Sequence, residues 1–372
     1  MKKSRFLVLF ALLLAIGMVL GACGSSDEGK SGSDSEGSGS DGNSSEDNGD
    51  FSVGMVTDVG GVDDKSFNQS AWEGLQAFGK EHDMEKGKGF DYSQSESDAD
   101  YTTNLNRLVR EDYNLIFGIG YKLQPAIEKV ASQYPDTNFS IVDSVAKKSD
   151  NIASITFKEH QGSFLAGVVA AMKTKSNKVG FVGGVDGDLI NKFEAGYVAG
   201  VKSVNPDIDV DVQYAGSFAA ADKGKLIASS MYSKGIDVIY HASGATGNGV
   251  FSQAKDIKKN DPDKDVWVIG VDRDQYDEGQ IGDNNVTLTS MVKRVDVAVQ
   301  DVANQAMEGN FPGGKVLEYG LDDDAISIAR TNKDALTDDI LSAVDKWKEK
   351  IVNGDVEVPS TRDELEKFQK SL

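Results

Sequence analysis

Short apolar runs alternate with longer segments of helical periodicity from residue 51 almost to the end of this 372-residue chain. The runs are rich in β-branched and aromatic residues and predict strands, whereas apolar residues three or four positions apart predict helices. Several runs are apolar at nearly every position, as expected for strands covered on both faces. The alternation predicts an α/β fold with parallel sheets between layers of helices. The predicted strands span 51–57, 114–120, 138–143, 153–157, 178–182, 208–214, 236–241, 266–272 and 286–291. The predicted helices span 67–82, 101–110, 124–134, 161–174, 190–204, 221–233, 249–259, 295–308 and 340–352.

The first 50 residues differ in composition and predict export. A basic start precedes an apolar run over residues 6–20, and small residues then lead to Cys23, the single cysteine. This pattern predicts a secretory signal over residues 1–22. Residues 20–23, Leu-Gly-Ala-Cys, resemble the lipobox of bacterial lipoproteins, whose cysteine is lipidated and becomes the new N-terminus. The resemblance implies a chain anchored by lipid to the extracytoplasmic face of a cell membrane, as on a Gram-positive surface. The alternative is an ordinary signal followed by a chance cysteine.

Residues 24–50 consist almost entirely of Ser, Gly, Asp, Glu and Asn and contain no apolar side chain. Such a segment cannot bury enough surface to offset the entropy lost on ordering. We therefore predict a disordered acidic tether over residues 23–50. A lipidated cysteine followed by a tether would hold a globular domain just outside a membrane.

Negative charge dominates the chain, with a formal net charge of −21. Residues 51–372 carry −17 of it, which argues against nucleic acid or an anionic membrane surface as a partner. A generic solvated acidic surface explains the charge. A body of ~320 residues more naturally forms two lobes than one.

The sequence contains none of the common catalytic motifs. The histidines His82, His160 and His241 lack metal-ligand spacing, and neither a GxSxG motif nor a Walker A loop occurs. We therefore expect no enzyme, no metal and no cofactor. The glycine-rich stretch 244–249 follows a predicted strand and could hold a phosphate. Because it lacks a lysine, a close backbone approach to a neutral ligand is the favoured interpretation.

Polar residues lie at the ends of several predicted strands, where open α/β sheets bind their ligands. Asp58, Asp143 and Asp272 stand at or just after strand ends, and Lys293 follows the strand predicted over 286–291. A single aspartate in such a place is often only a helix N-cap. Three of them, interspersed with glycine loops, favour a polar ligand site.

The segment 57–74 is the richest in candidate ligand contacts. Its two glycines, Gly60 and Gly61, permit a tight turn, and Ser66 is a plausible N-cap for the helix that follows. Phe67 and Asn68 then lie at the helix start beside the strand ends. An aromatic ring next to an amide suits a planar heterocycle, although Phe67 could equally fix the helix start to the core.

The blocks of sequence in this region and further along resemble the basic membrane protein family, bacterial lipoproteins that include purine nucleoside receptors. The resemblance covers essentially all of residues 51–330 and is specific because the blocks are many and collinear. The blocks are 57–69 (TDVGGVDDKSFNQ), 118–121, 139–143, 161–167, 193–196, 216–218 and 289–293.

The resemblance implies a type I periplasmic-binding-protein fold, with two Rossmann-like lobes joined by a three-stranded hinge and the ligand between them. Lobe 1 would comprise 51–157 with about 275–325, and lobe 2 would comprise 158–274 with about 326–372. The implied role is that of a nucleoside receptor, for adenosine, guanosine or inosine, that works with ABC permease and ATPase subunits.

The resemblance also assigns roles to individual residues. Phe67 and Phe218 would sandwich the base, and Asp58 with Asn68 would contact its edge. The ribose contacts would be Asp143, Asp272, Lys293 and the backbone of Gly247. Two alternatives remain open: a sugar-binding receptor of the same fold, and a surface adhesin or antigen without a transport role.

Overall fold

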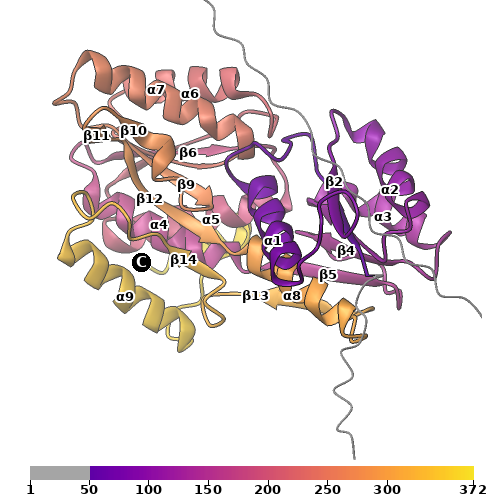
Figure 1. Ribbon diagram of the computed structural model, residues 1–372. Coiled ribbons are helices and arrows are strands. Elements are labelled where there is room, and N and C mark those ends of the chain that lie inside the picture. Colours follow the sequence, from indigo (N-terminus) through magenta and orange to yellow (C-terminus); the bar gives the residue numbers. More distant parts are fainter. Residues whose placement is uncertain (1–50) are drawn as a thin grey trace, which may run out of the picture. The chain divides into compact units, whose positions relative to one another are not determined.

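The computed structural model describes residues 51–372, which fold into two α/β lobes (Figure 1). The predicted signal over 1–22, the tether over 23–50 and the lipidation of Cys23 lie outside the described residues. Within residues 51–372, no helix combines the length and the apolar character needed to cross a membrane.

The first lobe is built on a six-stranded sheet in which every pair of neighbours is parallel. Its strand order is β13-β5-β4-β3-β1-β2. Helices α1 and α8 share one hydrophobic cluster with this sheet, whereas α2 and α3 form a separate cluster with its other face. The strands are β1 (Val53–Val56), β2 (Phe90–Ser93), β3 (Leu115–Ile119), β4 (Asn138–Val142), β5 (Ile152–Phe157) and β13 (Val316–Tyr319). The helices are α1 (Phe67–Glu81), α2 (Tyr101–Arg110), α3 (Gln124–Ala131) and α8 (Val295–Met307).

The second lobe repeats this plan with the order β14-β12-β9-β8-β6-β7, and only β14 is antiparallel. Helices α6 and α7 cover one face, and α4, α5 and α9 lie on the other side (Figure 1). The strands are β6 (Lys178–Gly183), β7 (Asp209–Tyr214), β8 (Val238–Ala242), β9 (Trp267–Asp272), β12 (Thr287–Lys293) and β14 (Ile326–Ile328), with a small hairpin of β10 (Gln280–Ile281) and β11 (Asn284–Asn285). The helices are α4 (Glu159–Lys173), α5 (Asp188–Val204), α6 (Ala221–Ser233), α7 (Gly247–Asn260), α9 (Asp338–Val352) and α10 (Arg362–Gln369). Short 3-10 turns span Asp98–Asp100, Tyr121–Leu123, Gly244–Thr246 and Asp277–Gly279.

These sheets confirm the predicted α/β fold with parallel sheets in two lobes. The chain passes from one sheet to the other three times: between β5 and α4, between β12 and α8, and between β13 and β14. One lobe boundary differs from the expectation. We expected the return to lobe 1 near residue 275, but β12 pairs with β9, so the chain returns only after Lys293. An apolar run such as 286–291 can join either sheet, and its composition does not reveal which.

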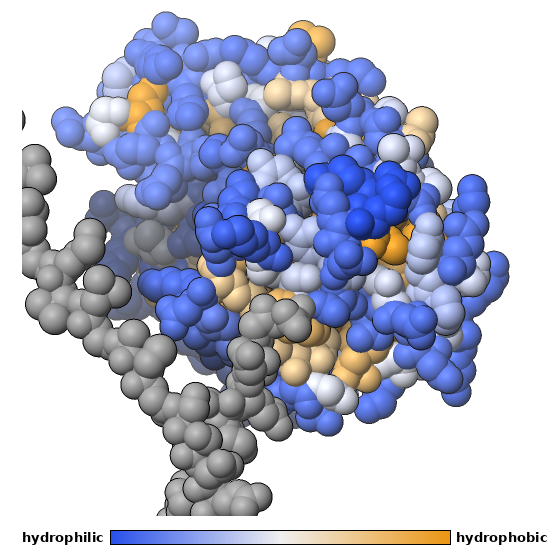
Figure 2. All heavy atoms as spheres, turned by 45° about the vertical axis from the view of Figure 1, so that its right-hand side comes forward, coloured by the Kyte–Doolittle hydropathy of each residue, from blue (hydrophilic) through white to orange (hydrophobic). Residues whose placement is uncertain are grey.

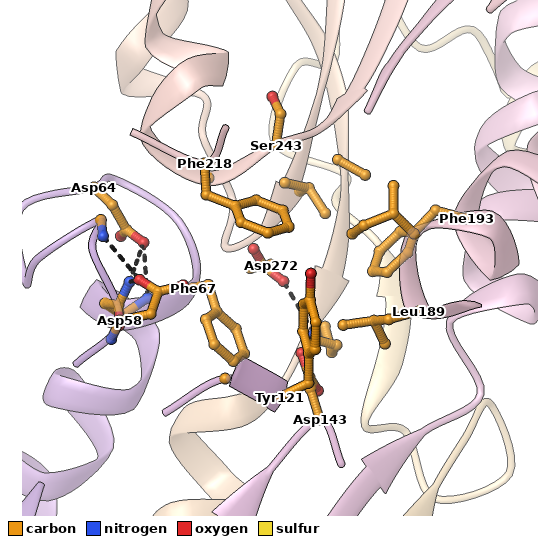
Figure 3. A pocket seen from close by; sticks show the side chains of 18 residues that line it. Asp58, Asp64, Phe67, Tyr121, Asp143, Leu189, Phe193, Phe218, Ser243 and Asp272 are labelled. Atoms are coloured by element: carbon orange, nitrogen blue, oxygen red, sulfur yellow. Dashed lines mark hydrogen bonds and ion pairs between the residues drawn. The ribbon is translucent and has the colours of Figure 1, made fainter. Parts of the chain in front are cut away.

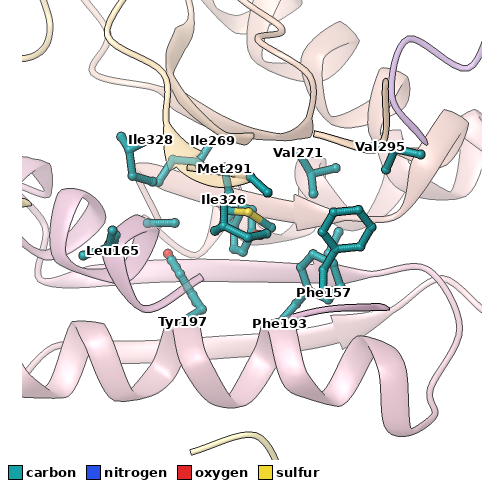
Figure 4. Close-up of a cluster of buried hydrophobic side chains, with 14 of the residues drawn as sticks. Phe157, Leu165, Phe193, Tyr197, Ile269, Val271, Met291, Val295, Ile326 and Ile328 are labelled. Atoms are coloured by element: carbon teal, nitrogen blue, oxygen red, sulfur yellow. The ribbon is translucent and has the colours of Figure 1, made fainter. Parts of the chain in front are cut away.

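Helices α4 and α5 pack with their backbones in close approach. A Cβ atom added to Gly200 would lie 2.0 Å from the carbonyl oxygen of Phe164, and one added to Gly167 would lie 2.2 Å from that of Tyr197. The absence of a side chain at these positions permits this close approach. Side chains of the two helices, such as Leu165 and Phe193, meet those of the second sheet in one apolar cluster (Figure 4).

The surface is mostly polar on the face shown in Figure 2, with small apolar areas between hydrophilic residues. Few large apolar side chains among residues 51–372 are well exposed, and Leu226 on α6 is the most exposed of them, at 71%. Scattered apolar residues of this kind are ordinary on a folded protein and mark no interface by themselves.

Candidate ligand-binding site between the lobes

A cavity lies between the two lobes, where the carboxyl ends of strands from both sheets face each other (Figure 3). It contains about 520 Å³ of space outside protein atoms, part of which is open to solvent. Among the residues predicted from sequence, those that line the cavity are Asp58, Phe67, Asn68, Asp143, Phe218, Asp272 and Lys293.

Gly247 is the predicted contact that does not line this cavity. It begins α7 and packs on a buried histidine, since a Cβ atom there would lie 2.1 Å from Cε1 of His241. Gly244, three residues earlier, lines the cavity instead and has a φ of 55°. Of the two glycines, Gly244 is therefore the one that a ligand in this cavity would meet.

Asp58 is oriented by Asn68. The Nδ2 atom of Asn68 donates to Oδ1 of Asp58 at 2.7 Å and to Oδ2 of Asp64 at 3.0 Å, and its Oδ1 accepts from the amide of Asp58 at 3.3 Å. Both amide hydrogens of Asn68 are thus used within the protein. Oδ1 of Asp58 also accepts from the amide of Gly60 at 2.8 Å. This arrangement leaves Oδ2 of Asp58 as the atom of this group best able to accept from a ligand.

Asp64, rather than Ser66, caps α1. Its carboxylate accepts from the backbone amides of Ser66, Asn68 and Gln69 at 2.9, 2.9 and 3.1 Å. Ser66 occupies the predicted N-cap position but makes no capping hydrogen bond with its side chain. Its hydroxyl instead donates to Oδ2 of Asp272 in the second lobe, at 2.5 Å.

Lys293 joins the two lobes through a buried ion cluster. Its Nζ lies 2.7 Å from Oδ2 of Asp143, which follows β4 in lobe 1, and 3.5 Å from Oδ1 of Asp272, at the end of β9 in lobe 2. Burial opposes the charge on Lys293, but the carboxylates of Asp143, Asp272 and Glu159 outweigh that effect and raise its pKa. The lysine is therefore a permanent cation in this site.

Burial also opposes the charge on the carboxylates, and for an acid this means a higher pKa. It raises the pKa of Asp58, and it raises the pKa values of Asp64 and Asp272 to about 6 despite their hydrogen bonds and, for Asp272, the nearby Lys293. Oδ1 of Asp143 is buried and has no hydrogen-bond partner among the described residues. Such an atom is costly to bury unpaired, so it is a natural acceptor for a ligand hydroxyl.

Both aspartates of this cluster occupy unusual backbone positions. Asp143 has a φ of 63° and Asp272 a φ of 65°, in the left-handed region that aspartate, asparagine and glycine adopt most readily. Asp143 follows β4 and Asp272 is the last residue of β9. These two strands hold equivalent places in the two sheets. In each lobe, a left-handed residue at the end of a strand therefore places one carboxylate beside Lys293.

Aromatic side chains from both lobes project into the cavity. Phe67 comes from the start of α1 and Phe218 from the loop before α6, and both rings face the interior (Figure 3). Nζ of Lys293 lies 4.7 Å from the centre of the Phe67 ring, within cation–π range. Tyr121 meets Phe218 edge to face, with ring centres 6.4 Å apart.

Several residues that line the cavity were not among those predicted from sequence. Tyr121 is the second residue after β3, so the strand-end rule that selected the aspartates could have found it. Asp64 stands within the segment already singled out for its ligand contacts. Leu189 and Phe193 come from the first two turns of α5, and nothing in their local sequence separates a cleft-facing residue from a core residue.

The fold and the cavity together define a class of protein: a two-lobed receptor that encloses a small solute between α/β lobes. A model of the Bmp family, described as "ABC transporter substrate-binding protein PnrA-like", matches residues 51–362. The chain belongs to the Bmp family and is an ABC transporter substrate-binding protein, a class that acts by binding rather than catalysis. The predicted family resemblance is confirmed.

Close relatives extend over nearly the whole chain. A "CD4+ T-cell-stimulating antigen" of Listeria innocua is 58% identical over 96% of this chain and 99% of its own length. The "ABC transporter nucleoside-binding protein BmpA" of Lactococcus lactis is 46% identical with the same coverage. Among solved structures, an ABC transporter solute-binding protein from Aeropyrum pernix is 26% identical with a TM-score of 0.75, covering 86% of this chain and 98% of that one.

Proposed function

We propose that this chain binds purine nucleosides in the cavity between its lobes and delivers them to the permease and ATPase subunits of an ABC importer. The observation that carries the proposal is the pairing of aromatic faces with carboxylates and one lysine in a single cavity. A nucleoside has both matching parts, a flat base and a ribose diol. The name of the Lactococcus lactis relative supports the same assignment.

Each part of the cavity has a role in this proposal. Phe67 and Phe218 contact the two faces of the base, and Oδ2 of Asp58 accepts from a donor on its edge. Asp143 and Asp272 accept from the ribose hydroxyls, since one carboxylate can accept two donors, and Lys293 donates to a ribose oxygen. Asn68 acts through Asp58 rather than on the ligand.

The charge of the cavity argues against phosphorylated ligands. Four aspartates, Asp58, Asp64, Asp143 and Asp272, line it with one cation, Lys293. A phosphate group would meet like charges, and an uncompensated repulsion of this kind rejects a ligand effectively. A neutral nucleoside avoids that repulsion and still satisfies the buried acceptors.

A sugar receptor is the principal alternative, because a free pentose would also satisfy Asp143, Asp272 and Lys293. Calorimetric titration with inosine, guanosine, adenosine, cytidine and ribose separates the two functions. We expect purine nucleosides to bind and ribose to bind far more weakly. Phe67→Ala and Phe218→Ala should each weaken inosine roughly 5- to 150-fold, since stacking on an aromatic ring contributes about 1–3 kcal/mol per base.

The matched control is Phe368→Ala, which removes a phenylalanine on α10 that packs near Phe164 outside the cavity. It should leave inosine affinity unchanged. Failure of every nucleoside to bind would refute the proposed function, and tight ribose binding that survives both cavity substitutions would favour the sugar receptor. An adhesin or antigen without transport would have no need for the buried charge cluster.

We further propose that lipid on Cys23 holds this receptor at the outer face of the membrane. The support is the Leu-Gly-Ala-Cys sequence over residues 20–23. We expect the wild-type chain, expressed in a bacterium with the lipidation machinery, to enter the detergent phase of a Triton X-114 extract. Cys23→Ala should release it to the aqueous phase with unchanged inosine affinity. Retention of the variant in the detergent phase would contradict the lipid anchor.

A further inference from the structure

Residues 64–66, which we call the interlobe turn, contact the second lobe at each of three consecutive positions. The carbonyl oxygen of Asp64 accepts from Nδ2 of Asn248 at 3.2 Å, and that of Lys65 accepts from Nε2 of Gln275 at 2.8 Å. The hydroxyl of Ser66 donates to Asp272. Lys65 has a φ of 63°, so this part of the turn is held in a backbone conformation that lysine seldom adopts.

The amide of Gln275 has only one orientation compatible with its neighbours. Its Oε1 accepts from the backbone amide of Val271 at 2.9 Å, which can only donate, so Nε2 must face the carbonyl of Lys65. Oε1 also lies 3.0 Å from Nε2 of His241, and burial lowers the pKa of that histidine to about 4. His241 is therefore neutral near pH 7 and donates from Nε2. Gln275 is 1% exposed and is fixed within lobe 2 before it reaches lobe 1.

Asp64 connects this contact with the ligand cavity. Its carbonyl faces Asn248, while its carboxylate holds Asn68, which in turn holds Asp58. A side chain that contacts the ligand and a backbone group that contacts the other lobe therefore belong to one short hydrogen-bonded network. Neither Asn248 nor Gln275 lines the cavity, so neither is placed to recognise a ligand directly.

We propose that Asn248 and Gln275 are positioning residues that hold the cleft closed through the interlobe turn and so determine how long a ligand stays bound. Opening the lobes must break their hydrogen bonds, whereas entry of a ligand into an open cleft does not require them. They should therefore control dissociation far more than association. The inference relies on the proposed function only for the identity of the ligand used to test it.

The sharpest test is Asn248→Asp. Asn248 is the second residue of α7, where the positive end of the helix favours a carboxylate, so the substitution should not weaken the fold. The same carboxylate would face the carbonyl oxygen of Asp64 with no hydrogen to donate. We expect stopped-flow measurements with inosine to show a dissociation rate at least about tenfold faster, with association within about twofold of wild type. Asn248→Ala, which only removes one hydrogen bond, should accelerate dissociation roughly threefold to tenfold.

Gln253→Glu is the matched control, because it makes the same amide-to-acid change on the same helix, and Gln253 forms no side-chain hydrogen bond within residues 51–372. Its dissociation rate should equal that of wild type. Equal dissociation rates for Asn248→Asp and Gln253→Glu would overturn the proposal, as would an effect confined to association.

A second readout requires no ligand and separates this proposal from the proposed function. Cys23→Ser removes the native thiol, and Thr103→Cys in α2 and Leu226→Cys in α6 then provide one dye site in each lobe. Energy transfer between the two dyes measures the distance between the lobes. Asn248→Asp should shift the population toward the open state relative to Gln253→Glu, even if no nucleoside binds the wild-type chain. Identical energy-transfer distributions for the two variants would refute the role in closure.

Discussion

Replacing Lys293 with methionine is expected to weaken nucleoside binding at least about 100-fold and to lower the free energy of unfolding by about 3–5 kcal/mol. The substitution keeps the length and apolar stem of the side chain but removes the cation that Asp143 and Asp272 share. Two buried carboxylates would then repel each other without compensation, and the donor proposed for the ribose would be lost. Calorimetry with inosine and urea denaturation measure the two effects.

Two further variants separate binding from stability. Adding Asp143→Asn and Asp272→Asn to Lys293→Met removes the uncompensated charges, so it should restore part of the stability without restoring inosine binding. Lys264→Met removes an exposed lysine of the loop before β9 and should change neither quantity. Wild-type inosine affinity in Lys293→Met would show that the lysine plays no part in the ligand site.

Gly200→Ala is expected to destabilise the chain by about 3 kcal/mol or more, an overpacking effect at the upper end of those usually seen. The added Cβ would lie 2.0 Å from the carbonyl oxygen of Phe164 and 2.8 Å from its carbonyl carbon. Both are backbone atoms, so relief requires α4 and α5 to move apart rather than a side chain to rotate. Urea denaturation followed by circular dichroism measures the loss.

Gly187→Ala is the control for Gly200→Ala, because it makes the same glycine-to-alanine change without the close contact. Gly187 precedes α5 with an extended φ of 168°, and a Cβ atom there would meet nothing within 4 Å. We expect its unfolding free energy to stay within about 0.5 kcal/mol of wild type. Comparable effects of the two substitutions would show that the close approach of α4 and α5 does not limit stability.

The sequence predicted the interior of the fold well, but at the sheet edges it predicted only β7 and missed β2, β13 and β14. Central strands such as β3 and β8 are buried along their whole length, so their composition alone identifies them. The edge strands β2 and β13 are short and partly exposed, and their polar residues match those of loops. Helix α10 is also polar, with a single buried residue, Leu365, and its position depends on contacts with α5 rather than on its own pattern.

The site residues that could be predicted are those whose place follows from a general rule of the fold. Asp58, Asp143 and Asp272 follow from the rule that ligands bind at strand ends, because parallel strands bring their carboxyl ends together. Phe218 and Gly247 were placed through family resemblance, and only Phe218 lines the cavity. Asp64 and Ser66 contact Asn248 and Asp272 of the second lobe. These contacts join segments far apart in the sequence, so they could not be predicted from the residues around Asp64 and Ser66.

The left-handed backbone at Asp143 and Asp272 has a consequence for how this family diversifies. Asparagine or glycine would fit the same φ with little strain, so either position can lose its charge by mutation while the chain path is preserved. A substitution of this kind would remove a partner of Lys293 without changing the fold around it. For the Listeria innocua relative named as an antigen, the identities of these two residues would therefore show whether the proposed charge cluster is retained alongside the fold.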